Sequence, residues 1–356
     1  MNRHLDFIVA GDPGQLTGGY VYDACIVGEL RSRGWTVRVH GLPGSFPDAD
    51  DDARTALQRT LAELPAGSRV VVDGLALGGL PEIALAHARR LRLVALVHHP
   101  LGDEGGLTPV RRRCLLASER AALAAACRVI ATSAFTARRL ADFGVHAARL
   151  RVVEPGVRRM PPAAADRHRP RLLCVATLTP RKAQDLLVLA LARLRHLPWH
   201  CDCIGSLSRA PAFTDEVARL VATAGLSDRI RLLGERDAKG LRQAYAESDL
   251  FVLPSRYEGY GMVITEAIAA GLPILTTTGG ALADTLPAGA GIGVPPGDVD
   301  ALAEALGRLL QDGELRLRLR DGARRERDRL REWSQAGAEF AAALADLPDA
   351  PPDAGG

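Results

Sequence analysis

The sequence predicts an α/β protein built from two Rossmann-like βαβ domains that face each other across a cleft. Short apolar runs typical of strands alternate with longer amphipathic patterns typical of helices along most of the 356 residues. The alternation stops once, in the proline-rich and charged segment from Glu154 to Pro170, and then resumes, which indicates a linker between two domains. Ligands of open parallel sheets bind beyond the carboxyl ends of the strands, so we expect the functional site there.

In the first domain, residues 1–160, strand patterns and helix patterns follow one another in turn. The apolar runs predict strands at Leu5–Ala10, Thr36–His40, Arg69–Asp73, Leu91–His98, Arg128–Thr132 and Leu150–Val153. The amphipathic patterns between them predict helices that include Val21–Arg33, Asp51–Leu64, Val110–Ala126 and Thr136–Phe143. This order predicts a parallel sheet with helices on both faces.

The second domain, residues 161–333, repeats the same order of patterns. Strands are predicted at Arg171–Ala176, Trp199–Ile204, Ile230–Leu233 and Leu250–Leu253. Helices are predicted at Lys182–Leu194, Ala212–Ala224, Leu241–Glu247 and Val299–Leu310, and a charged helix and the segment Ser334–Leu347 follow. The final stretch PDAPPDAGG, residues 348–356, has the composition of a disordered segment.

Composition excludes several classes of function. The net charge of +3 predicts no nucleic-acid partner, and the basic runs at 111–113 and 324–325 indicate solvated helix faces with at most a weak peripheral membrane contact. Cys201 and Cys203 form C-x-C, which is not the usual zinc spacing, and the cysteines suit a reducing compartment. The first apolar segment is too short for a signal peptide and no run of 18 apolar residues occurs, so we expect a cytoplasmic protein.

Two glutamates, Glu258 and Glu266, stand eight positions apart in the stretch Ser255–Pro273. Glu258 is expected in the loop that follows a strand, and Glu266 about one turn into a helix that begins near Gly261 and ends before Gly271. The free N–H groups at a helix start bind anions, and phosphate best of all. The residues alone leave two alternatives: a diphosphate on the helix start with a carboxylate on each side for sugar and ribose hydroxyls, or a turn with two exposed glutamates.

The surrounding stretch PSRYEGYGMVITEAIAAGLPIL closely resembles the donor-binding signature of retaining GT-B glycosyltransferases of family 4. The resemblance extends over nearly the whole chain. It implies a GT-B fold and the transfer of a sugar, with retention, from a nucleoside diphosphate sugar to an acceptor hydroxyl, without a required metal or other cofactor. It also implies that Glu258 faces the donor sugar and Glu266 binds the ribose. The backbone that would hold sugar and phosphate is that of Gly259, Tyr260, Gly261, Met262 and Val263.

The segment Leu172–Leu191 resembles the part of the family that supplies an arginine and a lysine to the donor diphosphate. Lys182 occupies the position of the lysine. The position of the family arginine is occupied here by Thr177, and Arg181 is a candidate to supply the missing charge from another point. Two positive charges would stabilise the leaving group as the bond breaks. A surface Arg-Lys pair before a helix is the alternative.

Glycines follow the first strand in GDPGQLTGGYVYDACIVGEL, but not at the G-x-G-x-x-G spacing of a dinucleotide-binding loop. The stretch resembles instead the first loop of the family, which implies that Gly18 and Gly19 lie against the donor diphosphate and the acceptor. A plain flexible turn is the alternative. His98, at the end of a strand, aligns with a family histidine that contacts the donor sugar, and His99 is the second candidate.

Three further residues are given structural roles. Glu119 matches a glutamate common in these enzymes and is expected to make a buried hydrogen bond, and Ser133 is expected to cap a helix. Trp333 is expected to pack before the helix at about 334–347, which in GT-B folds returns to the first domain.

Two other functions stay open. A glycoside hydrolase could use the two carboxylates as acid and nucleophile, and a nucleotide-sugar-binding protein could share the fold without catalysis. The residues 50–52 form an acidic run that begins a helix, so they predict no D-x-D metal site. The nucleotide base, the sugar, the acceptor and the oligomeric state are not predicted.

Overall fold

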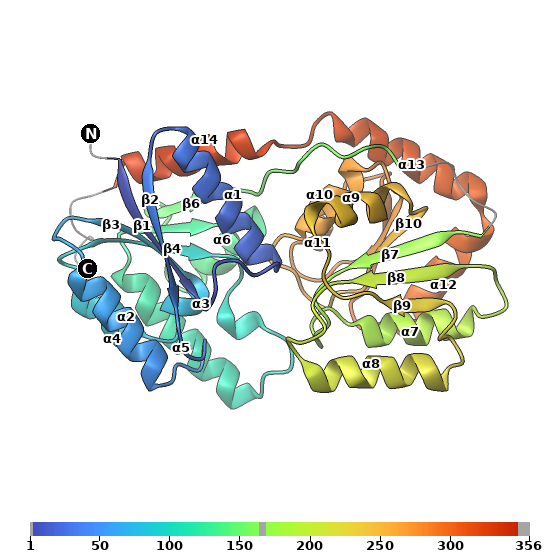
Figure 1. The fold of residues 1–356 in the computed structure, drawn as a ribbon, viewed down its shortest axis with the longest axis horizontal. Coiled ribbons are helices and arrows are strands. Elements are labelled where there is room, and N and C mark those ends of the chain that lie inside the picture. The colour runs from blue at the N-terminus through green and yellow to red at the C-terminus, as the bar shows by residue number, and fades with distance from the viewer. Residues whose placement is uncertain (1–2, 164–168, 348–356) are drawn as a thin grey trace. The chain divides into compact units, whose positions relative to one another are not determined.

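The computed structural model describes residues 3–163 and 169–347, and the chain divides into two compact units (Figure 1). The first unit comprises Met1–Gly156 and Glu332–Gly356, and the second comprises Val157–Arg331. The predicted disorder of residues 348–356 lies outside the described residues. Both units are Rossmann-like, with a parallel sheet between layers of helices, as predicted.

The first unit contains a six-stranded parallel sheet in the order β2-β1-β3-β4-β5-β6. Its strands are β1 His4–Ala10, β2 Thr36–Leu42, β3 Arg69–Asp73, β4 Arg92–Val97, β5 Arg128–Ala131 and β6 Leu150–Val152. The apolar runs form these strands because a parallel sheet is covered on both faces, and side chains such as Phe7, Val71 and Leu96 have no exposed surface.

The helices of the first unit are α1 Gly18–Ser32, α2 Asp51–Glu63, α3 Gly74–Leu77, α4 Pro81–His87, α5 Pro109–Ala125, α6 Ala134–Ala141 and α14 Trp333–Ala345, with the 3-10 turn η1 Leu101–Asp103. α4 packs on α2 and α5, and α14 packs along α1 (Figure 1). Ser133 caps α6, as predicted, since its Oγ accepts a hydrogen bond from the Thr136 N–H at 2.9 Å. Asp50 caps α2 in the same way, so the acidic run begins a helix as expected.

The second unit contains a second six-stranded parallel sheet, in the order β12-β11-β10-β7-β8-β9. Its strands are β7 Arg171–Val175, β8 His200–Ile204, β9 Ile230–Leu232, β10 Leu250–Leu253, β11 Ile274–Thr277 and β12 Gly291–Val294. From β7 the chain builds the sheet in one direction through β8 and β9, and from β10 it builds in the other. The strand order therefore reverses between β7 and β10, which is where open α/β sheets bind ligands.

The helices of the second unit are α7 Gln184–Arg193, α8 Pro211–Thr223, α9 Ala238–Ala246, α10 Met262–Ala269, α11 Leu282–Thr285, α12 Val299–Gln311 and α13 Gly313–Arg327. α7 packs on both α8 and α12, and α10 packs on α13 (Figure 1). Gly261 and Gly271 bound α10 with φ of 89° and 69°, the left-handed region that glycine adopts without strain. Within residues 3–163 and 169–347, no helix combines the length and apolar character needed to cross a membrane.

Candidate active site

The two loops that flank the reversal of the second sheet bring Lys182 and Glu258 together. Lys182 follows β7, Glu258 follows β10, and the two strands are hydrogen-bonded neighbours. Nζ of Lys182 donates to Oε1 of Glu258 at 2.5 Å, and Nη1 of Arg181 donates to Oε2 at 3.3 Å. One carboxylate is thus shared by both cations that the sequence assigns to a diphosphate.

The Glu258 carboxylate is buried and strongly held. Its side chain is 8% exposed, and Ser255 Oγ donates a further hydrogen bond to Oε1 at 2.6 Å. Burial by itself would raise the pKa of Glu258, but the charges of Lys182 and Arg181, with the bonds from Lys182 and Ser255, lower this pKa to about 2. Glu258 is therefore ionised at neutral pH and leaves the cluster with one net positive charge.

The backbone of Glu258 is fixed by Gly280, which the sequence analysis did not identify. The carbonyl oxygen of Glu258 accepts a hydrogen bond from the Ala281 N–H at 2.8 Å. A Cβ on Gly280 would lie 2.3 Å from that same oxygen, and Gly280 has a φ of +65°. Only glycine fits this position, and the Gly-Gly pair after β11 is the signal that could have shown it.

The Lys182 loop is tied to the Glu258 loop through backbone as well. Arg181 Nη1 donates to the Tyr257 carbonyl at 3.0 Å, and the Arg181 carbonyl accepts from the Arg256 N–H at 2.8 Å. Ala183, the buried N-cap of α7, has a φ of 56°, and no other described residue except glycines has a positive φ. This strained position directly after Lys182 indicates that the surrounding contacts fix the course of the loop.

Glu266 makes a contact that the motif did not predict. Its Oε2 accepts a hydrogen bond at 2.8 Å from the hydroxyl of Tyr245, a fully buried residue of α9. Burial raises the pKa of Glu266 to about 7, and the Tyr245 bond and the charge of Arg158 oppose part of that rise. Glu266 therefore exists in both protonation states near neutral pH. The only sequence signal for Tyr245 is an aromatic residue in an amphipathic helix.

The remaining predicted donor-binding residues lie in the turn between β10 and the first turn of α10. Gly259 and Tyr260 precede the N-cap Gly261, and Met262 and Val263 are the first helical residues. The first N–H groups of a helix have no partner within the helix and carry its positive dipole end. This backbone can therefore hold an anion, with the Glu258 cluster on one side and Glu266 one turn further along the helix.

In the first unit, a second group of predicted residues gathers at the carboxyl ends of the strands. Gly18 and Gly19 begin α1, and His98 directly follows β4. A Cβ on Gly19 would lie 3.2 Å from Cδ2 of His98, so the loop and the ring are in close contact. A Cβ on Gly18 would meet nothing within 4 Å, and sterics at this position do not require glycine.

His98 is held by a carboxylate that the sequence analysis missed. Its Nε2 lies 3.1 Å from Oδ1 of Asp23 in α1, and the buried carboxylate of Asp73 ends the neighbouring strand β3. Burial lowers the pKa of His98, but the charge and hydrogen bond of Asp23 and the charge of Asp73 raise it above its ordinary value overall. The second candidate, His99, has a different partner, since its Nε2 lies 3.1 Å from Oε2 of Glu104.

Two other predicted residues have structural contacts in the first unit. Glu119 is buried and accepts a hydrogen bond from the Leu101 N–H at 2.9 Å, as expected, and burial raises its pKa to about 8. Trp333 packs edge-on against Tyr22, with the ring centroids 5.7 Å apart. Of the six cysteines, Cys114 is exposed and Cys25 is partly exposed, whereas the other four are buried.

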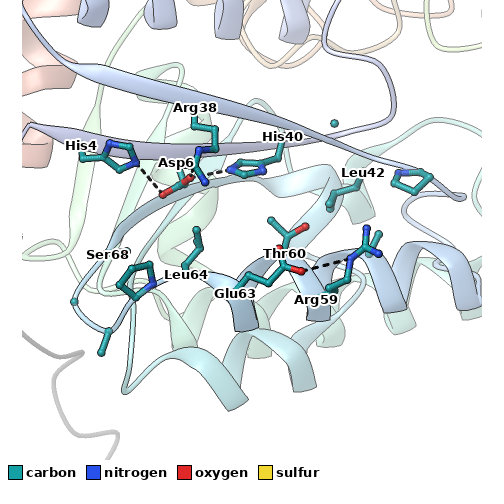
Figure 2. A pocket seen from close by; sticks show the side chains of 16 residues that line it. His4, Asp6, Arg38, His40, Leu42, Arg59, Thr60, Glu63, Leu64 and Ser68 are labelled. Atoms are coloured by element: carbon teal, nitrogen blue, oxygen red, sulfur yellow. Dashed lines mark hydrogen bonds and ion pairs between the residues drawn. The ribbon is translucent and has the colours of Figure 1, made fainter.

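A cavity of about 550 Å³ lies between β1, β2 and α2 in the first unit (Figure 2). On the strand side of the cavity the Asp6 carboxylate bonds to His40 at 2.8 Å, and on the α2 side Arg59 lies 3.9 Å from Glu63. Among the described residues that line it, none belongs to the predicted site. Asp6 and His40, and Arg59 and Glu63, are paired with each other in this cavity.

Two family models match the chain. The model described as glycosyl transferases group 1 matches residues 160–326, and the model described as Glycosyltransferase Family 4 matches residues 70–159. Each model therefore matches mainly one of the two units. The predicted donor-binding residues of the second unit lie in the first match, and His98 lies in the second.

The chain is similar to glycosyltransferases of known activity and to solved structures. The D-inositol 3-phosphate glycosyltransferase of Salinispora tropica is 31% identical over 64% of this chain, which spans 55% of that relative's length. The MMP alpha-(1->4)-mannosyltransferase of Mycolicibacterium hassiacum is 30% identical. The match covers 80% of this chain and 72% of that relative's length. Sucrose-phosphate synthase from Thermosynechococcus elongatus has the same fold, with a TM-score of 0.81 at 22% sequence identity. The superposition covers 97% of this chain and 99% of the synthase chain.

Proposed function

Because the chain belongs to glycosyltransferase family 4 and has a GT-B fold, we propose that it moves a sugar from a nucleoside diphosphate sugar to an acceptor hydroxyl. The transfer retains the configuration of the anomeric carbon and needs no metal ion. The second unit binds the donor and the first binds the acceptor. The contact between Lys182, Arg181 and Glu258 at the reversal of the strand order is the observation that supports this function best.

The residues of the second unit have distinct roles in this proposal. The start of α10 binds the diphosphate through its N–H groups, and Lys182 with Arg181 stabilises the charge that builds up on the leaving phosphate. Glu266 accepts hydrogen bonds from the ribose hydroxyls, and Glu258 faces the sugar. No side chain is assigned as a nucleophile. The leaving phosphate takes the proton of the acceptor hydroxyl on the same face of the sugar, which gives retention.

In the first unit, His98 is assigned a contact with the sugar, and Gly18 and Gly19 are assigned to substrate binding. His98 is 20% exposed, so its ring can meet a ligand while Asp23 holds it from the buried side. Gly19 lets the first loop lie directly against that ring. The neutral sugar hydroxyls suit the mixed donor and acceptor capacity of an imidazole.

The test is a screen of nucleotides and nucleotide sugars. UDP, GDP, ADP and TDP are compared by thermal shift, and their glucose and mannose derivatives by hydrolysis and by transfer to candidate acceptors. At about 100 times Kd the matching nucleotide should stabilise the protein by roughly 2.7 kcal/mol. Lys182→Ala should lose most of that shift. The anomeric configuration of the product, read by NMR, tests retention.

The same screen separates the alternatives. A glycoside hydrolase would cleave a neutral glycoside and would gain no stability from a nucleoside diphosphate. A binding protein without catalysis would gain the stability but give no turnover. The absence of a shift with all four diphosphates at millimolar concentration would rule out the proposed function.

A further inference from the structure

Asp23 is a buried carboxylate that no motif in the sequence singles out. It lies in the first turns of α1, and 7% of its side chain is exposed. Its Oδ1 has His98 as a partner, whereas its Oδ2 is buried without a hydrogen-bond partner among the described residues. A buried carboxylate with an unpaired oxygen lowers the stability of a fold, so stability does not explain why an aspartate occupies this position.

The His98 ring is fixed along the edge that carries Nε2. Asp23 faces Nε2 at 3.1 Å, and a Cβ on Gly19 would lie 3.2 Å from Cδ2 and 3.4 Å from Nε2. The Tyr22 ring packs at 82° to the imidazole with a centroid distance of 5.3 Å, and the Tyr22 hydroxyl donates to the Val153 carbonyl at 2.8 Å. Within the described residues Nδ1 has no hydrogen-bond partner, and 20% of the side chain is exposed, so this nitrogen can meet a ligand.

We infer that Asp23 is a positioning residue: it holds the Nε2–H of His98 and so makes Nδ1 the nitrogen that meets a sugar hydroxyl. The inference rests on the proposed function for the identity of the ligand. With the proton kept on Nε2, a neutral His98 accepts a hydrogen bond from the hydroxyl at Nδ1, and a protonated His98 donates one there. In both states the sugar meets one defined nitrogen.

Two carboxylates face His98, and they make different contacts. Asp23, from α1, both bonds to the ring and carries charge, whereas Asp73, at the end of β3, acts on the ring through its charge. Asp73 caps α3 by accepting from the Leu75 N–H at 3.2 Å. Asp23→Asn therefore removes the charge-assisted bond at Nε2, and Asp73→Asn removes a neighbouring charge but leaves that bond in place.

The first test uses the free protein and no substrate. NMR correlation of the histidine side-chain nitrogens reports the tautomer and the titration midpoint of each ring, and His98→Gln assigns the signal. The wild-type ring should be the Nε2–H tautomer. Asp23→Asn should lower the midpoint, because it removes the charge and the hydrogen bond that raise the pKa of His98, and should populate the Nδ1–H form. Asp73→Asn should keep the Nε2–H form.

Glu104→Gln is the matched control, because it removes the carboxylate beside His99 and should leave the His98 signal unchanged. With a donor identified, Asp23→Asn should lower kcat at least about tenfold and shift the pH profile, while the melting temperature changes little. An unchanged His98 tautomer and midpoint in Asp23→Asn overturns the inference whether or not the enzyme is active. Altered NMR with unchanged kinetics also overturns it, and the nucleotide screen tests the proposed function separately.

Discussion

Nζ of Lys182 and Oε1 of Glu258 lie 2.5 Å apart, although 76 residues separate them in the chain. The strands that precede them, β7 and β10, are neighbours where the strand order of the second sheet reverses. The pair therefore joins the two loops at the point where such sheets bind ligands.

Glu258 should stabilise the fold at neutral pH and lose this effect in acid. Its pKa of about 2 in the fold lies below the ordinary value of 4.5, so the unfolded chain binds a proton first as the pH falls. The stabilisation is complete above about pH 4.5 and is lost as the pH approaches 2. Glu258→Gln should lower the free energy of unfolding at pH 7 by on the order of 3 kcal/mol in urea titrations. An equal loss at pH 7 and pH 2.5 would contradict the ion pair.

Arg181 should act mainly in the transition state if it replaces the arginine missing at Thr177. Arg181→Ala should then lower kcat more than it raises the donor KM, because its contact with the phosphate tightens as the leaving group gains charge. Lys182→Ala is the comparison, and steady-state kinetics with the donor identified by the screen is the measurement. If Arg181→Ala leaves kcat and KM unchanged while Lys182→Ala strongly lowers kcat, the lysine acts alone.

Glu258 and Glu266 should affect different kinetic constants. Glu266→Gln should mainly raise the donor KM, because ribose contacts are alike in the ground and transition states. Glu258→Gln should mainly lower kcat, by an amount equivalent to a few kcal/mol, because positive charge develops on the sugar in the transition state. If Glu266→Gln lowers kcat and Glu258→Gln raises the donor KM, the two roles are assigned the wrong way round. If both variants melt at lower temperature with unchanged kinetic constants, the two carboxylates have structural roles only.

Donor binding should strengthen as the pH rises through the pKa of Glu266. This pKa is about 7, above the ordinary value of 4.5, so the carboxylate that accepts two ribose hydroxyls becomes fully populated only above neutral pH. The donor KM should fall between pH 6 and pH 8, and Glu266→Gln should flatten that dependence. Tyr245→Phe removes a hydrogen bond that lowers the pKa, so it should move the midpoint to higher pH. A midpoint that moves down would refute this account of the Tyr245 contact.

Activity should survive chelation of divalent metals. In the proposed mechanism Lys182, Arg181 and the N–H groups at the start of α10 stabilise the diphosphate charge that a metal ion stabilises in other transferases. Initial rates should be equal within error with EDTA and with added magnesium or manganese. A strict requirement for either metal would contradict the assignment of this role to Lys182.

The sequence alone determined the elements and the local geometry of the donor motif. The start of α10 after Gly261 and its end before Gly271 were predicted because caps and left-handed glycines depend on residues within one or two turns. The six strands of the first sheet and β7 to β10 of the second were predicted to within a few residues, since apolar runs between helical patterns are also local signals. The last two strands of the second sheet, β11 and β12, were not predicted. The long motif around Glu258 and Glu266 then indicated the family.

Only the tertiary structure decided which side chains meet. The Lys182–Glu258 and Asp23–His98 contacts span 76 and 75 residues, and they depend on the order in which the strands pair. Neither the hydrophobic periodicity nor the helix caps indicate the order in which the strands pair, because the strands carry similar apolar residues. The Tyr245–Glu266 bond likewise needs α9 to pack beside α10. The pKa values of these carboxylates follow from burial and from partners brought in by the fold, and so they could not be predicted from the sequence.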